Sequence, residues 1–313
     1  MNPIYRIILV GLLATTCIAD SVIYMRVHRP VIEEQLKLAP RDPADRIKTL
    51  RTLFQKGGCP QVMEQKVPGQ DVPNLMCILP GQEEGTLVVG ASSDYRSDDA
   101  TTPDGWSTLT ALPLLAESLS LVPHRFTLMF IAFTGHEHGM QGASWYVSQL
   151  TDVQRKSIRA MVDLDNLGKA SPVFTMAQSD NTLATWLEVA AQALRIPVPA
   201  QMDAANSPPQ PSLLSVKEED LWADATPFQQ KHVPAIALRS GTSATAFDID
   251  AYEDTYRLMC VYVLYLDRNL GRPLVEPGIY SGKIVDTAGI FPTSPIDVSV
   301  KIDRFNTTGE LNR

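Results

Sequence analysis

Acidic side chains recur where apolar strands end in this 313-residue chain. Asp94 follows the first predicted core strand, Glu137 follows the second, and Asp163 and Asp165 stand at the end of the third, while Asp104 lies just before a predicted helix. Because the carboxyl ends of parallel strands meet at one edge of an open sheet, we expect these acids to lie close together. Converging carboxylates can hold a metal ion or act as general acids and bases. The sequence therefore predicts a metal or acid/base site at this edge.

The turn after the second of these strands carries side chains that could move a proton. His136, Glu137 and His138 follow one another directly after an apolar run that ends at Phe133. A histidine titrates near neutral pH, so His136 could serve as a general base. The spacing differs from the zinc-binding HExxH helix, in which the second histidine comes two residues later.

Short apolar runs and helical patterns alternate from residue 86 to residue 270. The predicted strands are 86–91, 126–133, 160–164, 173–176 and 233–238, and the predicted helices are 106–121, 142–150, 181–194 and 251–270. Such alternation is typical of an α/β fold with a mostly parallel central sheet flanked by helices.

The chain divides into four predicted segments. These are a signal anchor or signal peptide (1–26), a polar linker (27–41), the α/β domain (42–272) and a C-terminal extension (273–313) with two strand-like pieces. The apolar run Ile7–Ala19 has the length of a signal-peptide core, whereas a run continued to Met25 is long enough to span a membrane. Cys17–Ala19 fits a small-x-small cleavage site, so cleavage stays open. Both readings place the body outside the cytoplasm, membrane-anchored or secreted, and periplasmic in a bacterium.

The net charge argues against one class of partner, and the cysteines bear on the compartment in which the protein folds. The formal charge is −8, the isoelectric point is near 5.2 and no basic cluster occurs, which argues against a nucleic-acid partner. Cys59 and Cys77 flank a strand-like segment and could pair in an oxidising compartment. Sequence alone leaves that pairing open, because it depends on the distance between the two Cα atoms. Cys260 lies in an apolar helix and is expected to be a buried thiol.

Five segments resemble metallopeptidase family twenty-eight, the zinc aminopeptidases, whose relatives include glutaminyl cyclases, nicastrin and the transferrin receptor ectodomain. The resemblance covers residues 45–270. The matching segments are Leu87–Asp94, Pro103–Ser107, Glu137–Ser144, Met161–Gly168 and Val233–Leu238. It implies the zinc-aminopeptidase-like fold and a ligand that is the N-terminus of a peptide or protein.

The resemblance also implies roles for individual residues. The family binds two zinc ions that share one bridging aspartate, and each ion takes one further carboxylate and one histidine. By position, Asp104 matches the bridging aspartate, and Glu137 and Asp165 match the two terminal carboxylates. Asp94 matches the aspartate that does not bind the metal itself but holds the first histidine ligand in place. In an alternative register, Asp98 or Asp99 would take the place of Asp104.

The chain departs from the family at three of its functional positions. Ser92 stands where the first histidine ligand belongs, and the segment Arg239–Asp254, where the second is expected, contains no histidine. His136 stands at the position of the general-base glutamate. Zinc prefers nitrogen and sulfur donors, so we expect most zinc affinity to be lost, while another divalent metal remains possible. Without metal the acids would repel one another, and a protonated His136 or His138 would offset that repulsion.

Two functions fit these features. The first is a membrane-anchored, extracytoplasmic, non-hydrolytic member of the fold that binds peptides or proteins. The second is an active metal-dependent exopeptidase or amidohydrolase with a remodelled single-metal site, in which His136 is the base and Asp104, Glu137 and Asp165 hold the metal. Trp222 and Phe228, near the proline-rich loop 197–215, could line a peptide pocket or pack in the core.

Overall fold

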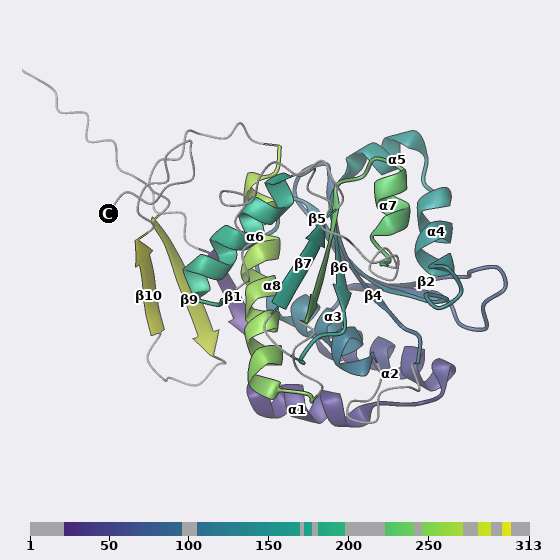
Figure 1. Ribbon diagram of the computed structural model, residues 1–313, viewed down its shortest axis with the longest axis horizontal. Helices are drawn as coiled ribbons and strands as arrows, with labels where there is room; N and C mark the ends of the chain where they lie inside the picture. Colours follow the sequence, from purple (N-terminus) through teal and green to yellow (C-terminus); the bar gives the residue numbers. More distant parts are fainter. Residues whose placement is uncertain are drawn as a thin grey trace, which may run out of the picture.

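A seven-stranded sheet forms the centre of the molecule (Figure 1). The computed structural model describes residues 22–95, 105–169, 172–176, 181–197, 223–240, 246–271, 281–288 and 296–301. In spatial order the strands are β2 (Gln61–Gln65), β3 (Asn74–Leu79), β5 (Thr127–Phe133), β4 (Thr86–Ser92), β6 (Ile158–Asp165), β8 (Ala235–Ser240) and β7 (Pro172–Met176).

The sheet is mixed. The four central strands β5, β4, β6 and β8 are parallel, and β2, β3 and β7 add antiparallel pairings at the two sides. The predicted α/β fold with a central sheet flanked by helices is confirmed. The expectation of a mostly parallel sheet was wrong for its flanks, where three of the six pairings are antiparallel. The hairpin from β2 to β3 has a short connection, and a short connection permits only antiparallel pairing.

Helices cover both faces of the sheet (Figure 1). One layer contains α1 (Arg29–Leu38), α2 (Pro43–Lys56), α3 (Trp106–Leu119), α6 (Asn181–Leu194) and α8 (Ile249–Asn269), and the other contains α4 (Gln141–Ser148), α5 (Asp152–Ser157) and α7 (Thr226–Gln230). The central strands are apolar along their whole length because both of their faces are buried. In β4, for example, Leu87 and Val89 pack into one core, and Val88 packs into the other.

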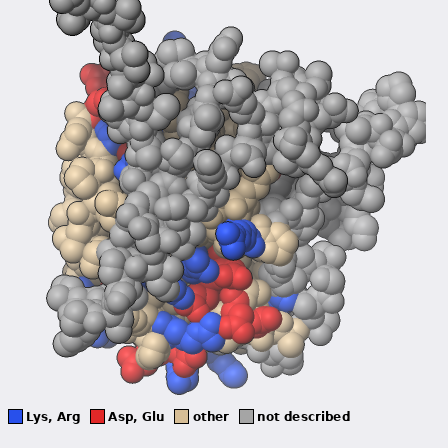
Figure 2. Space-filling model, turned by 90° about the vertical axis from the view of Figure 1, so that its left-hand side faces the viewer, with Lys and Arg blue, Asp and Glu red and all other residues tan. Residues whose placement is uncertain are grey.

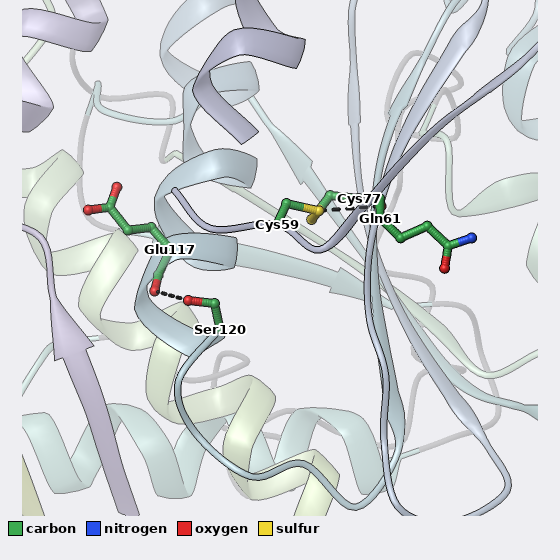
Figure 3. The surroundings of a disulfide bond; sticks show 5 residues. All are labelled: Cys59, Gln61, Cys77, Glu117 and Ser120. Atoms are coloured by element: carbon green, nitrogen blue, oxygen red, sulfur yellow. Dashed lines mark hydrogen bonds between the residues drawn. A yellow bond between two sulfur atoms is a disulfide. The ribbon is translucent and has the colours of Figure 1, made fainter. Parts of the chain in front are cut away.

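A helix cap begins α2, and a disulfide links the chain just after this helix to β3. Asp42 caps α2, and its carboxylate accepts hydrogen bonds from the backbone nitrogens of Ala44 and Asp45. After α2 ends, Cys59 forms a disulfide with Cys77 of β3, with 6.1 Å between the Cα atoms (Figure 3). The pairing left open by the sequence is thereby confirmed. Cys260 is buried and forms no disulfide with the described residues.

Residues before the α/β domain are part of the fold. The predicted linker 27–41 was wrong, because it contains α1, and residues 22–26 form β1 (Val22–Arg26). Strand β1 pairs in parallel with β9 (Ser281–Ala288), which pairs antiparallel with β10 (Ile296–Lys301). The two strand-like pieces of the C-terminal extension are therefore confirmed. Their pairing with β1 joins segments about 260 residues apart, for which no local pattern exists.

Ion pairs fasten this N-terminal segment to α8. Arg26 and Arg29 both contact the carboxylate of Glu253, which is buried, and Arg29 Nε donates to Glu253 Oε2 at 2.8 Å. Burial raises the pKa of Glu253, but the bonds and charges of the two arginines outweigh it and hold that pKa below its usual range. Figure 2 shows acidic and basic side chains intermixed on this side of the molecule.

The predicted membrane segment falls mostly on residues 1–21, which lie outside the described residues. Its last part, Val22–Arg26, is strand β1, in which Val22 and Tyr24 are buried in the main core. No helix among the described residues is long and apolar enough to cross a membrane.

Candidate functional site

The candidate site lies at the carboxyl edge of the parallel strands. The register pairs Ser92 of β4 with Phe133 of β5, and Asp165 of β6 with Arg239 of β8. The chain leaves each of these strands at the same edge. Side chains just beyond the strand ends are therefore brought together, as the sequence predicts.

Asp94 holds the turn that follows β5. Its Oδ1 accepts a hydrogen bond from Gly135 N at 2.9 Å, and its Oδ2 accepts one from Glu137 N at 3.2 Å. The sequence resemblance implies that Asp94 supports a histidine ligand, but Ser92 stands at that position, and Ser92 Oγ accepts from Asp94 N at 3.1 Å. In this chain Asp94 positions the backbone of the His136 turn.

A buried arginine fixes the other side of Asp94. Arg46 of α2 is fully buried, and its guanidinium donates to the carbonyl oxygens of Ser93 at 2.9 Å and Asp94 at 3.2 Å. The same guanidinium lies over the ring of Trp106, 5.3 Å from the centroid. Arg46 thus ties α2 and the start of α3 to the edge of β4.

The backbone of the turn itself is tightly enclosed. Asn74 Oδ1 accepts from Thr134 N at 3.0 Å, and Asn74 Nδ2 donates to the carbonyl of Gly142 at 2.9 Å. Gly135 has φ +70°, and a Cβ there would lie 2.8 Å from the side chain of Gln70. Any other residue would be strained at this φ and would have to displace the end of the Gln70 side chain, so Gly135 helps to set the direction in which His136 leaves the strand.

His136 points into the protein and pairs with an acid. The residue is 6% exposed, and its Nδ1 lies 3.2 Å from Oδ2 of Asp224, which is 1% exposed and precedes α7. Burial lowers the pKa of His136, but the hydrogen bond and charge of Asp224, with the charges of Asp163 and Asp165, outweigh it and raise this pKa to about 9. His136 is therefore protonated at neutral pH.

Asp163 is the second buried acid of this cluster. It is 2% exposed, and its pKa is raised well above the usual range by burial, then by the charges of Asp224 and Asp165, against the opposing charge of His136. Burial also raises the pKa of Asp224, although the bond to His136 opposes the shift. The Oδ1 atoms of Asp163 and Asp224 have no hydrogen-bond partner among the described residues. The cluster therefore retains protons at higher pH than isolated carboxyl groups do.

The remaining predicted residues differ in exposure and contacts. Asp165 Oδ2 lies 3.8 Å from a guanidinium nitrogen of Arg239, whose side chain is 17% exposed. Glu137 and His138 are both exposed on the turn, so neither enters the buried cluster. The structure brings His136 and Asp165 to one cluster, and it leaves Glu137 and His138 at its surface.

Several predicted residues lie outside the described part of the chain. These are Asp104, the alternatives Asp98 and Asp99, and Trp222. Phe228 is buried, with its ring 6.1 Å from that of Phe133 and 5.9 Å from that of Tyr146. The pocket-lining role considered for Phe228 was wrong, and core packing is its role.

Sequence reasoning missed Asp224 and Arg239. Asp224 stands between a long proline-rich segment and a five-residue helix, where no periodic pattern marks it. Pro227 signals the start of that helix, and an acid just before a helix that leads into a core strand could have drawn attention to it. Arg239 is the one charged residue in the apolar strand β8, and that contrast was the available signal.

The described residues do not fit a zinc ion. No three His, Cys, Asp or Glu side chains within the described ranges stand close enough together to hold a metal. Ser92 offers no imidazole, His136 directs Nδ1 at Asp224, and a guanidinium lies beside Asp165. The donor set therefore lacks the nitrogen ligands that zinc prefers.

Comparison with known proteins identifies the family. The family model described as Peptidase family M28 matches residues 74–258, more than half of the chain. Aminopeptidase LapA of Legionella pneumophila has 15% identity and a TM-score of 0.60, over 78% of this chain and 73% of LapA. A glutaminyl cyclase from an Acidobacteriales bacterium has 12% identity and a TM-score of 0.52, over 77% of this chain and 93% of that protein.

A third similar structure is longer than this chain. BSAP, a zinc aminopeptidase from Bacillus subtilis, has 17% identity and a TM-score of 0.50, over 61% of this chain and 49% of BSAP, so the match spans about half of that enzyme. No protein of curated function matches the sequence. At these identities the structural matches establish the fold alone, while the family model establishes the lineage: the chain belongs to peptidase family M28.

Proposed function

We propose that this chain is a non-hydrolytic member of peptidase family M28 that binds peptides or proteins through a free N-terminus. The observation that carries the proposal is the buried contact between His136 Nδ1 and Asp224 Oδ2 at 3.2 Å. His136 occupies the position that the family resemblance gives to the general base. In this chain that position holds a buried, acid-paired imidazole.

Such an imidazole is a poor activator of water. A general base works best when its pKa is close to the working pH and its acceptor atom can reach the proton. Because the acids around His136 raise its pKa to about 9, both ring nitrogens carry protons near neutral pH, and the ring is buried away from water. A protonated imidazole can donate a proton or pair with an anion, but it cannot take a proton from water. These features support binding over hydrolysis.

The relatives and the charge at the surface of the site support the proposed ligand class. Aminopeptidases such as LapA are named for action at the amino end of peptides. Glu137 is exposed at the turn, where its carboxylate can pair with an amino group. Beside the same turn lies an open groove of about 340 Å³, lined by Val67, Pro68, Gly139, Gln141, Ser144, Trp145 and Ser148. We propose that the groove accepts side chains of the bound peptide.

The compartment is proposed to be extracytoplasmic. A disulfide between Cys59 and Cys77 is typical of proteins that fold in an oxidising environment. The apolar run Ile7–Ala19 would direct export, and the chain would be membrane-anchored through this segment or released by its cleavage.

The proposal is tested with the full-length protein and a fluorescent peptide in two forms, with a free or an acetylated amino terminus. Anisotropy should report binding of the free form, about 10-fold weaker binding of the acetylated form, and a similar loss for Glu137→Gln. Mass spectrometry of the same mixture, with zinc added, should detect no released amino acids. Steady release of N-terminal residues would refute the non-hydrolytic proposal, and equal affinity for both forms would refute the ligand class.

A further inference from the structure

Basic side chains of the chain itself stand among the carboxylates of the site. Arg239 places a guanidinium nitrogen 3.8 Å from Asp165 Oδ2, and His136 places Nδ1 3.2 Å from Asp224 Oδ2. The two pairs belong to four different segments of the chain. Each pair joins one acid of the strand-edge cluster to one basic side chain.

The position of Arg239 is fixed by the sheet. Strands β6 and β8 are parallel neighbours, and their register sets Asp165 directly opposite Arg239. The side chain of Arg239 is 17% exposed, so its guanidinium lies mostly within the protein beside the carboxylate. The pair results from the strand register, which backbone hydrogen bonds maintain, so it needs no ligand to form.

Carboxylates that lie close together and are wholly or mostly removed from water require a compensating positive charge or protonation, and the Asp165 side chain is 25% exposed. In the zinc aminopeptidases that the chain resembles, two zinc ions meet this requirement. Here a guanidinium, which is charged at all physiological pH values, already lies beside Asp165, and it repels any divalent ion that approaches the same oxygens. Ser92 provides no imidazole to favour such an ion.

We propose that the guanidinium of Arg239 supplies, beside Asp165, positive charge that zinc ions supply in related enzymes, so that the folded centre is independent of metal. Arg239 is a positioning residue in this arrangement, because it holds Asp165 through an ion pair and has no assigned contact with a ligand. This inference goes beyond the proposed function. It concerns how the centre is held together, whatever the centre binds.

The test is thermal unfolding of the full-length protein after chelation and after addition of Zn²⁺ or Mn²⁺. The wild type should keep its Tm within about 1 °C in all three conditions, because a ligand stabilises a fold only if it binds the folded state. Arg239→Met should lower Tm by about 5 °C or more, since it removes the guanidinium charge beside Asp165, and Arg239→Lys should restore most of this loss. Arg155→Met, which breaks the exposed pair with Asp152, is the matched control and should leave Tm nearly unchanged.

A double-variant comparison separates the ion pair from simple loss of packing. If the pair carries the effect, Arg239→Met should lower Tm much less in an Asp165→Asn background than in the wild type. Equal losses in both backgrounds would overturn the proposal, as would a wild-type Tm that falls by several degrees on chelation or rises by several degrees with zinc. The wild-type Tm values with chelator and with added metal test the proposal even if Arg239→Met fails to fold. Peptide hydrolysis by the chelated protein would refute the proposed function and leave this inference standing.

Discussion

The Nδ1 atom of His136 lies 3.2 Å from the Oδ2 atom of Asp224, although 88 residues separate the two in sequence. Both side chains are buried at the edge of the parallel strands. The contact joins the turn after β5 to the segment before α7, two parts of the chain that are far apart in sequence. Its energetic and functional consequences can be measured separately.

Replacement of Asp224 should destabilise the protein strongly. Asp224→Asn removes the charge that compensates His136 and leaves a buried imidazolium without its partner, a change that costs about 3–5 kcal/mol. Urea unfolding measures the loss. Asp152→Asn breaks an exposed pair with Arg155 and, as a control, should cost less than about 1 kcal/mol. A loss of the same small size for Asp224→Asn would contradict the buried ion pair.

The stability of the protein should fall as pH rises above neutrality. The pKa of His136 is about 9 in the folded protein and 6.5 as its ordinary value, so folding binds this proton more tightly. The resulting stabilisation is fully present below about pH 6.5 and is lost as pH rises through about 9. The charged groups that act on His136 are Asp224, Asp163 and Asp165. A shift of this size corresponds to about 3 kcal/mol.

Urea midpoints measured between pH 6 and pH 9.5 test this dependence. His124, whose pKa is lowered by burial from 6.5, affects stability only at the lower end of this window, and Tyr146, whose pKa is raised to about 12, affects it above the window. The His136→Gln variant should show a shallower slope than the wild type, and Asp163, whose pKa is raised well above its usual range, contributes to the slope in the same direction. A wild-type midpoint that stays constant across this range would show that His136 is neutral in the folded protein.

Reduction of the disulfide should destabilise the fold. The Cys59–Cys77 bond closes a loop with a sequence separation of 18 residues, which corresponds to about 3 kcal/mol of stability in the chain-entropy model. The protein should unfold at lower temperature in the presence of a reductant. The double variant Cys59→Ala with Cys77→Ala should show the lower Tm from the outset and no further change on reduction. A wild-type Tm insensitive to reductant would contradict a stabilising bond.

Much of the fold could be predicted from the sequence, because local patterns specify it. The run Phe126–Phe133 is continuously apolar and forms β5, and Asp42 with Pro43 marks the start of α2. Strand β1 could not be predicted, since its partner β9 is distant in sequence and an apolar start to a chain fits a membrane segment equally well.

The candidate site was predicted only in part, for a similar reason. The acids at strand ends follow from the alternation of strands and helices, and Asp165 was found in this way. The contacts of Asp224 and Arg239 depend on strand register and on the path of an irregular segment, neither of which has a signature in sequence. Family resemblance identified His136 as unusual, but the structure was required to find the acid that binds it.

The turn that carries His136 should depend on the absence of a side chain at Gly142. A Cβ at that position would lie 2.4 Å from both the carbonyl oxygen of Thr134 and Oδ1 of Asn74. We expect Gly142→Ala to cost about 2–3 kcal/mol in urea unfolding, because backbone atoms must move to admit the methyl group. Ser144→Ala, at an exposed position of the same helix, should change stability by less than about 0.5 kcal/mol. Equal effects of the two changes would mean that the turn adapts freely.

The central claim is that Arg239 supplies positive charge to the strand-edge carboxylates in a centre that does not use metal. The most direct test is the metal content of the purified full-length protein, dialysed against zinc and manganese, freed of unbound ions, and analysed by elemental mass spectrometry. The account predicts far less than one ion per chain for the wild type, with no change in Asp165→Asn or Asp104→Asn. Near-stoichiometric metal that disappears in either variant would contradict it and would favour a metal-dependent hydrolase.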